Sequence, residues 1–230
     1  MNGLIHSSLY FGMLVSVGAY MLGVWLKKKT GWAILNPLLV AIIVVIAFLS
    51  VFHIEYKEYN RGAVYLGYFL TPATVCLAIP LYKQLELLRQ HLIAVASAIV
   101  AGVAGSVGSI YVMCRFFQLE HTHYVTLLPK SITTAIGMGV SEEAGGIVTL
   151  TVISIIITGI LGNIIADWLF RIFKIEEPIA KGLALGTAAH AIGTAKALEL
   201  GEIEGAMSSL SIAVAGLLTV VVVPLMSGLI

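Results

Sequence analysis

The sequence predicts an all-α integral membrane protein with about seven or eight transmembrane helices, two short broken or re-entrant segments and an inverted repeat. The 230-residue chain is 59% hydrophobic but only 11% charged, and its mean hydropathy is +1.01. Soluble domains carry about twice that charged fraction. Six stretches without Asp, Glu, Lys or Arg are long enough to cross a bilayer core, which takes roughly 20 apolar residues: 1–26, 30–54, 62–82, 92–114, 144–166 and 205–230.

The first stretch resembles a secretory signal peptide only in its hydrophobicity. Lys27, Lys28 and Lys29 follow its apolar run instead of preceding it, so we expect a retained span. The net charge of +1 indicates no nucleic-acid partner, and Cys76 and Cys114 lie in apolar runs. No metal, nucleotide or nucleophile motif is present. We therefore expect neither a metal, a cofactor nor an enzyme.

Two uncharged runs differ from the predicted spans. Residues 131–141 and 182–195 are only 11 and 14 residues long and are rich in Gly, Thr, Ser and Ala. Neither is long enough to cross a bilayer as a plain apolar helix. We expect both segments to be broken or to re-enter the face from which they came.

An internal repeat accounts for one of these runs. Thr74–Leu87 aligns with Thr187–Leu200 at an offset of 113 residues, with seven of 14 positions identical. Chance similarity among Ala, Leu and Ile is the alternative. The alignment predicts repeat units 34–118 and 147–230 within one membrane domain, 1–230.

The repeat also places helix interruptions in corresponding positions. Pro72 and Pro80 interrupt the first copy, and Gly193 stands opposite Pro80 in the second. Such paired interruptions are the sequence pattern that marks a transporter's binding site.

The basic residues predict the topology, because loops rich in Lys and Arg remain in the cytoplasm. Lys83, Arg89 and the loop 171–181 are all cytoplasmic only if residues 125–141 re-enter one face. The second unit then runs opposite to the first. The acidic residues Glu199, Glu202 and Glu204 would lie outside. A plain eight-span chain, the alternative, would put the loop 171–181 outside.

Two lysines border the short runs. An ionisable group at membrane depth is costly and indicates function, and Lys130 and Lys196 hold such positions. A lysine beside hydroxyl groups suits a carboxylate, and a helix broken at Gly193 points backbone amides at the same anion. Snorkelling to the headgroups is the alternative. The hydroxyl candidates are Ser131, Thr133, Thr134, Thr187 and Thr194.

Two residues are candidates for proton coupling. His190 lies within the second run, where it either accepts a proton or bonds a substrate hydroxyl. A neutral histidine bonded to a neighbouring carbonyl is the alternative. Glu142 follows the first run and either binds a proton or is a solvated charge.

Several motifs together resemble the LrgB/CidB family over essentially the whole chain. They are Pro129–Thr134, Ser141–Gly146, Ile179–Glu199 and Gly201–Ala206. The resemblance implies a multi-pass protein of the bacterial cytoplasmic membrane that acts with a smaller LrgA/CidA-type membrane protein. It implies either a carrier of glycolate, glycerate or pyruvate, or an antiholin-like modulator of murein hydrolase export and autolysis.

The broken segments favour the carrier. Our leading hypothesis is a secondary carrier of small monocarboxylates, in which the lysines offset substrate charge. The holin-like alternative needs oligomeric packing but no substrate site. The substrate, the coupling ion, the direction of transport, a homo-oligomer and the need for the partner stay open.

Overall fold

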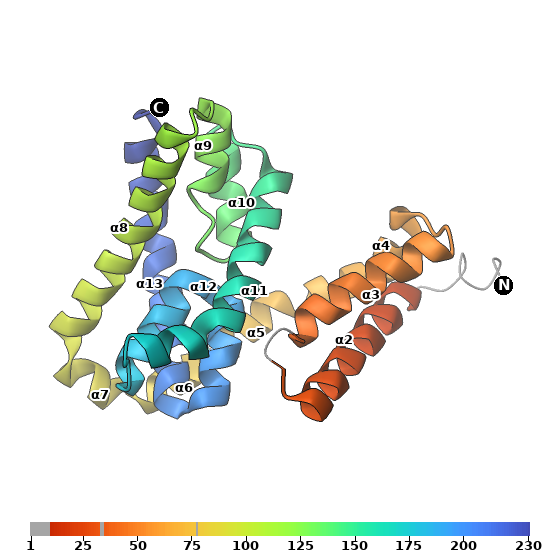
Figure 1. Cartoon of the computed structure of the whole chain (residues 1–230), viewed down its shortest axis with the longest axis horizontal. Helices are drawn as coiled ribbons and strands as arrows, with labels where there is room; N and C mark the ends of the chain where they lie inside the picture. Colours follow the sequence, from red (N-terminus) through yellow and green to blue (C-terminus); the bar gives the residue numbers. More distant parts are fainter. Residues whose placement is uncertain (1–9, 33–34, 77) are drawn as a thin grey trace. The chain divides into compact units, whose positions relative to one another are not determined.

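The computed structural model describes residues 10–32, 35–76 and 78–230 and divides the chain into two compact units, Met1–Cys76 and Leu77–Ile230 (Figure 1). The described residues are helical apart from turns and short connections, and they contain no strand. The predicted all-α class is confirmed for them. The predicted single domain and its repeat boundaries stay predictions.

The first unit packs three helices around close backbone contacts. They are α2 (Phe11–Thr30), α3 (Pro37–Val51) and α4 (Tyr56–Gly67), and α2 contacts the other two. Gly12 lies against the backbone of Tyr59, and the Ser16 and Tyr59 hydroxyls share a hydrogen bond of 2.7 Å. The beginning of the predicted span 1–26 lies outside the described residues.

The predicted span 62–82 is not one continuous helix, as the interruption at Pro72 and Pro80 indicated. The chain forms the end of α4, then α5 (Leu70–Cys76), α6 (Ala78–Lys83) and α7 (Leu85–Gln90). Pro72 and Pro80 lie in this region, and a proline lacks the N–H that continues a helix. Leu77, between α5 and α6, lies outside the described residues.

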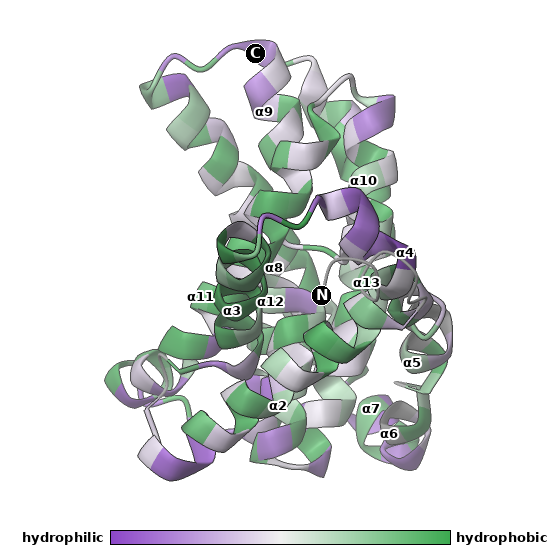
Figure 2. Cartoon of the chain, turned by 90° about the vertical axis from the view of Figure 1, so that its right-hand side faces the viewer, coloured by the Kyte–Doolittle hydropathy of each residue, from purple (hydrophilic) through white to green (hydrophobic). Residues whose placement is uncertain are grey.

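Three helices of the second unit are long and apolar enough to cross a membrane. Among the described residues these are α8 (Leu92–Phe116), α11 (Val148–Ile172) and α13 (Glu202–Ser227), which match three predicted spans. They are predominantly hydrophobic (Figure 2). Leu217 and Leu225 are at least 70% exposed on α13. Apolar side chains that face outward along a long helix fit contact with lipid.

The first re-entrant segment, residues 121–143, forms a hairpin. It consists of α9 (His121–Leu127), a connection, and α10 (Thr134–Glu143). Thr126 accepts a hydrogen bond from the amide of Ile147 at 2.8 Å. The hairpin therefore begins and ends at the same end of the bundle, which is compatible with the predicted re-entry of residues 125–141, and re-entry into a membrane face stays a prediction. We call residues 121–143 the first hairpin.

The second re-entrant segment lies within α12 (Pro178–Leu200), which is bent sharply at His190. His190 has φ 41° and ψ −133°, which no α-helix contains. Gly193 lies against the carbonyl of Leu185, although residues eight apart in a straight helix are about 12 Å apart. The chain therefore reverses, and we call residues 178–200 the second hairpin.

The second hairpin corrects the predicted position of the acidic residues. Lys181, Leu200 and Arg171 line one cleft, and Gly182 lies against the backbone of Glu204. Glu204 therefore lies at the same end of the bundle as Lys181. Its predicted position on the opposite face is wrong, because residues 178–200 return instead of crossing.

The two hairpins enter the second unit from opposite ends. The first lies where α8 finishes and α13 ends, since Tyr124 donates a hydrogen bond to the carbonyl of Met226. The second lies where α11 finishes. Figure 1 shows α9 beside the C-terminus, with α6 and α7 at the other end of this unit. Each of α8 and α11 is thus followed by a hairpin that turns back into the bundle.

Candidate functional site

The connection at the tip of the first hairpin brings a lysine and two serines together. Lys130 Nζ donates a hydrogen bond of 3.1 Å to Ser131 Oγ. Ser106 Oγ, from α8, donates one of 2.8 Å to the same oxygen. Ser131 is buried and Lys130 half-buried. Lys130 thus lies beside a hydroxyl group, and the predicted role of both residues in binding a substrate stays a prediction.

Ser106 was missed by sequence reasoning. It lies in a long run of Ala, Gly and Val that also contains Ser97 and Ser109, whose hydroxyls bond backbone carbonyls of their own helix. Nothing in the sequence separates Ser106 from these two. Only the position of the first hairpin against α8 does so.

The tip of the second hairpin buries His190. Its side chain is 3% exposed, and Nε2 lies 2.9 Å from the carbonyl oxygen of Ile155 on α11. The ring also lies close to Gly159, where a side chain would collide with it. Because a carbonyl oxygen can only accept, Nε2 donates this hydrogen bond, which fits the alternative of a histidine bonded to a neighbouring carbonyl. His190 thus holds the second hairpin against α11, and its role in proton coupling stays a prediction.

Thr194 continues this polar contact along the second arm. Its hydroxyl donates to the carbonyl of His190 at 3.1 Å and shares a hydrogen bond of 2.7 Å with Ser208 on α13. Gly193 lies where the two arms come closest. Gly193 therefore serves close packing, and Thr194 links the hairpin to α13.

The two hairpin tips lie next to one another. Ser106, Ser131, Thr187 and Thr219 line one gap, together with apolar side chains. The gap is about 10 Å³, which is room for about one water molecule. This state is closed, so a larger ligand enters only if a hairpin moves.

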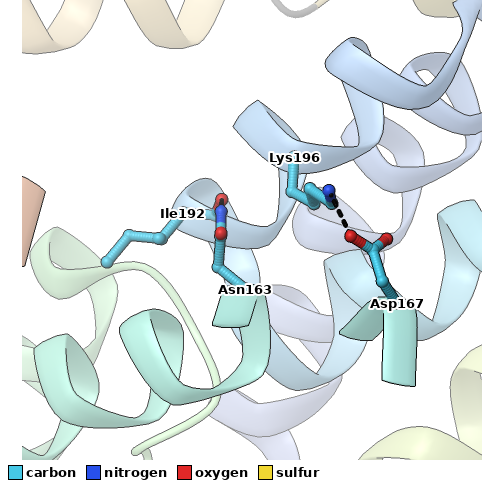
Figure 3. A network of polar contacts seen from close by, with 4 residues as sticks. All are labelled: Asn163, Asp167, Ile192 and Lys196. Atoms are coloured by element: carbon cyan, nitrogen blue, oxygen red, sulfur yellow. Dashed lines mark hydrogen bonds and ion pairs between the residues drawn. The ribbon is translucent and has the colours of Figure 1, made fainter. Parts of the chain in front are cut away.

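Lys196 has a different environment from Lys130. It forms an ion pair of 2.8 Å with Asp167 of α11, and their side chains are 15% and 43% exposed. Asn163, one turn earlier on α11, donates from Nδ2 to the carbonyl of Ile192 at 3.2 Å (Figure 3). These contacts fasten the second arm to α11. The proposed contact of Lys196 with a substrate stays a prediction.

The remaining candidates lie along α10. Thr133 and Thr134 begin this helix, close to Ser131, and Thr133 makes no capping hydrogen bond through its side chain. Glu142 is exposed near the other end of the helix. The structure therefore places the threonines at the tip and Glu142 at the base. Among the described residues no group of three His, Cys, Asp or Glu side chains is placed to hold a metal ion.

Comparison with known proteins matches residues 16–229 to the LrgB-like family. The chain is 41% identical over 217 residues to antiholin-like protein LrgB of Bacillus mycoides (strain KBAB4), covering 94% of each chain. It is 39% identical over 216 residues to antiholin-like protein LrgB of Bacillus subtilis (strain 168), again over 94% of each. No solved structure matches the chain.

Proposed function

This chain belongs to the LrgB-like family, and from that premise we propose that it is a secondary carrier of small monocarboxylates such as pyruvate, glycolate or glycerate. The opposed hairpins carry the proposal. Irregular backbone at membrane depth is tolerated only where protein buries it or where it lines a cavity. Carriers place such broken helices around a binding site near the middle of the bilayer.

The charge at the first tip supports an anionic substrate. Lys130 forms no ion pair with any side chain that the structure describes. A charge in that position is costly unless a counter-charge accompanies it. A carboxylate would supply the counter-charge and would also accept hydrogen bonds from Ser131 and Ser106, of which Ser106 now donates to Ser131.

Alternating access follows from the position of the hairpins. The gap between the tips holds about one water, so the closed state excludes a monocarboxylate. We propose that each hairpin opens the site toward its own end of the bundle. The inverted repeat of units 34–118 and 147–230 and the count of seven or eight spans belong to the same proposal.

Proton coupling is the part of the proposal assigned to His190. If this residue carries the coupled proton, His190→Gln abolishes proton-driven accumulation and preserves exchange of substrate. If it only bonds Ile155, the variant is less stable but still accumulates substrate. Counterflow measured beside concentrative uptake separates the two results.

The names of the relatives favour a second candidate. Both Bacillus proteins are named antiholin-like, which suggests a role in modulating murein hydrolase export and autolysis. Such a role depends on association in the membrane, including with a smaller LrgA/CidA-type protein. It does not require saturable binding of a carboxylate.

Uptake into proteoliposomes tests the carrier. Vesicles that contain only this protein are given radiolabelled pyruvate, glycolate or glycerate, and parallel vesicles also contain an LrgA/CidA-type protein. The proposal expects saturable uptake of at least one substrate in one of the two preparations. Absence of uptake in both, with the protein folded and inserted, contradicts the proposal and leaves the antiholin-like role.

A further inference from the structure

An open cleft of about 380 Å³ lies at the base of the second hairpin. Three basic residues from separate parts of the chain line it. Arg171 comes from the end of α11, Lys174 from the following turn and Lys181 from the first arm of the hairpin. Leu200, at the end of the second arm, also lines the cleft. The cleft therefore lies where α11 and both arms of the hairpin meet.

The charges of the basic residues in this cleft are not neutralised by ion pairs within the part of the chain that the structure describes. None of the side chains that the structure describes forms an ion pair with Arg171, Lys174 or Lys181. The cleft contains two carboxylates, of which Asp167 is paired with Lys196. Glu176 is thus the one unpaired lining carboxylate among the described residues, against three cations. The cleft therefore has an excess of positive charge.

The cleft lies at the end of a helix that is long and apolar enough to cross a membrane, and this position narrows the choice of ligand. α11 is a span that finishes here, and its neighbouring residues Trp168, Ile172 and Phe173 are 63%, 51% and 69% exposed. Exposed apolar side chains beside unpaired cations match a molecule with an anionic head and apolar chains. Basic pockets at the cytoplasmic ends of transmembrane helices bind the headgroups of anionic lipids.

We propose that this cleft binds a phosphate-bearing anion, and that its source is the headgroup of an anionic phospholipid. Lys and Arg side chains form strong charge-assisted hydrogen bonds to phosphate oxygens. The bound headgroup bridges α11 to the second hairpin through Arg171 and Lys181. The site is separate from the hairpin tips, and it does not depend on what the protein carries.

Lipid binding to the purified full-length chain tests the site. The protein is kept in detergent with zwitterionic phosphatidylcholine, and phosphatidylglycerol is titrated in. Bound lipid is counted by native mass spectrometry, and the thermal unfolding midpoint is followed in parallel. Inorganic phosphate is titrated separately to distinguish a free phosphate from a lipid.

Two variants remove charge without disturbing the core. Lys181→Gln removes the charge but keeps an unbranched polar side chain at this half-buried position. Lys174 has φ 51°, a left-handed conformation that favours glycine at the end of a helix. Lys174→Gly therefore removes the ammonium group while fitting the backbone better. Lys28→Gln, on exposed α2, is the control with the same change in net charge.

The proposal expects saturable binding of phosphatidylglycerol and a raised midpoint for the wild type and for Lys28→Gln. Each cleft variant should weaken this binding about tenfold, the loss expected for one charge-assisted hydrogen bond. Equal binding of phosphatidylglycerol by all four proteins overturns the site. If inorganic phosphate at equal concentration displaces the lipid, the proposal that the bound phosphate group belongs to a phospholipid is wrong.

Discussion

The two hairpins of the second unit both reverse the direction of the chain, but different contacts hold them in place. The base of the first is held by buried hydroxyls: Thr151 Oγ1 bonds the carbonyl of Thr126 at 2.9 Å and the hydroxyl of Ser141 at 2.6 Å. The second arm of the second hairpin is held by the partly exposed pair Lys196–Asp167. Buried networks are costly to break, whereas partly exposed ion pairs contribute little. The second hairpin also has buried hydrogen bonds near its tip, at His190 and Thr194. The difference therefore concerns the outer part of its second arm, which we expect to loosen more easily than the base of the first hairpin.

The largest expected effect on stability comes from adding one methyl group to the second hairpin. The same change in the first hairpin is its control. Gly193→Ala would drive a Cβ into the backbone carbonyl of Leu185, which cannot move without separating the arms. Overpacking of this kind costs about 1–3 kcal/mol, or more where backbone must shift. Gly139→Ala in α10 meets nothing within 4 Å. Thermal unfolding should show a large loss for Gly193→Ala and none for Gly139→Ala.

Equal midpoints for the two alanine variants would contradict the close crossing of the arms of the second hairpin. A loss in both would indicate that α10 also packs against a surface that the isolated chain leaves open.

The next effect tests the base of the first hairpin. Thr151→Val keeps the shape of the side chain but leaves buried hydrogen-bonding groups of Thr126 and Ser141 without this partner. We expect a loss of about 1–3 kcal/mol in the free energy of unfolding. Thr30→Val, at an exposed position, is the control. Urea unfolding in mild detergent measures both, and a loss no larger than that of the control would remove the network from the account.

The smallest effect on stability is expected at the second hairpin. Lys196→Gln removes an ion pair whose partner is 43% exposed, so the loss should be about 0–1 kcal/mol. Hydrogen exchange of residues 191–200 should nevertheless become faster, while exchange of residues 121–143 stays unchanged. Faster exchange in both segments, or in neither, would show that this pair does not fasten the second arm alone.

The class of the fold could be predicted because membrane spans depend on local composition. The uncharged stretches that became α8, α11 and α13 are long and apolar, and no tertiary contact is needed to recognise them. The short length of residues 131–141 and 182–195 also sufficed to predict broken segments, since bilayer thickness sets a minimum. Both segments reverse direction as hairpins.

The position of the acidic residues could not be predicted from charge alone. Glu204 was expected opposite Lys181 because the second run was treated as a crossing, and its reversal at His190 puts both at one end. The repeat that aligns Pro80 with Gly193 did not predict that the chain reverses at His190. A left-handed backbone at a histidine is a product of tertiary packing, here against Ile155 and Gly159.

Part of the candidate site followed from residue type and part did not. Lys130 and Ser131 were predicted together because a lysine beside hydroxyl groups is unusual at membrane depth. Their side chains form a hydrogen bond. Lys196 has the same sequence surroundings, yet Asp167 lies beside it. That pairing joins α11 to a hairpin 29 residues later, a distance over which sequence pattern says nothing about contact.

Binding of pyruvate and glycolate to purified Lys130→Gln tests the central claim most directly, namely that the hairpin tips form a carboxylate site. The account predicts that the wild type and Lys28→Gln bind saturably in calorimetry. Lys130→Gln should bind about 10- to 100-fold more weakly while still folding, since a charge-assisted hydrogen bond contributes about 1.5–3 kcal/mol. Lys130→Arg should restore binding only in part. Normal binding by Lys130→Gln, or no saturable binding by the wild type, would contradict the account.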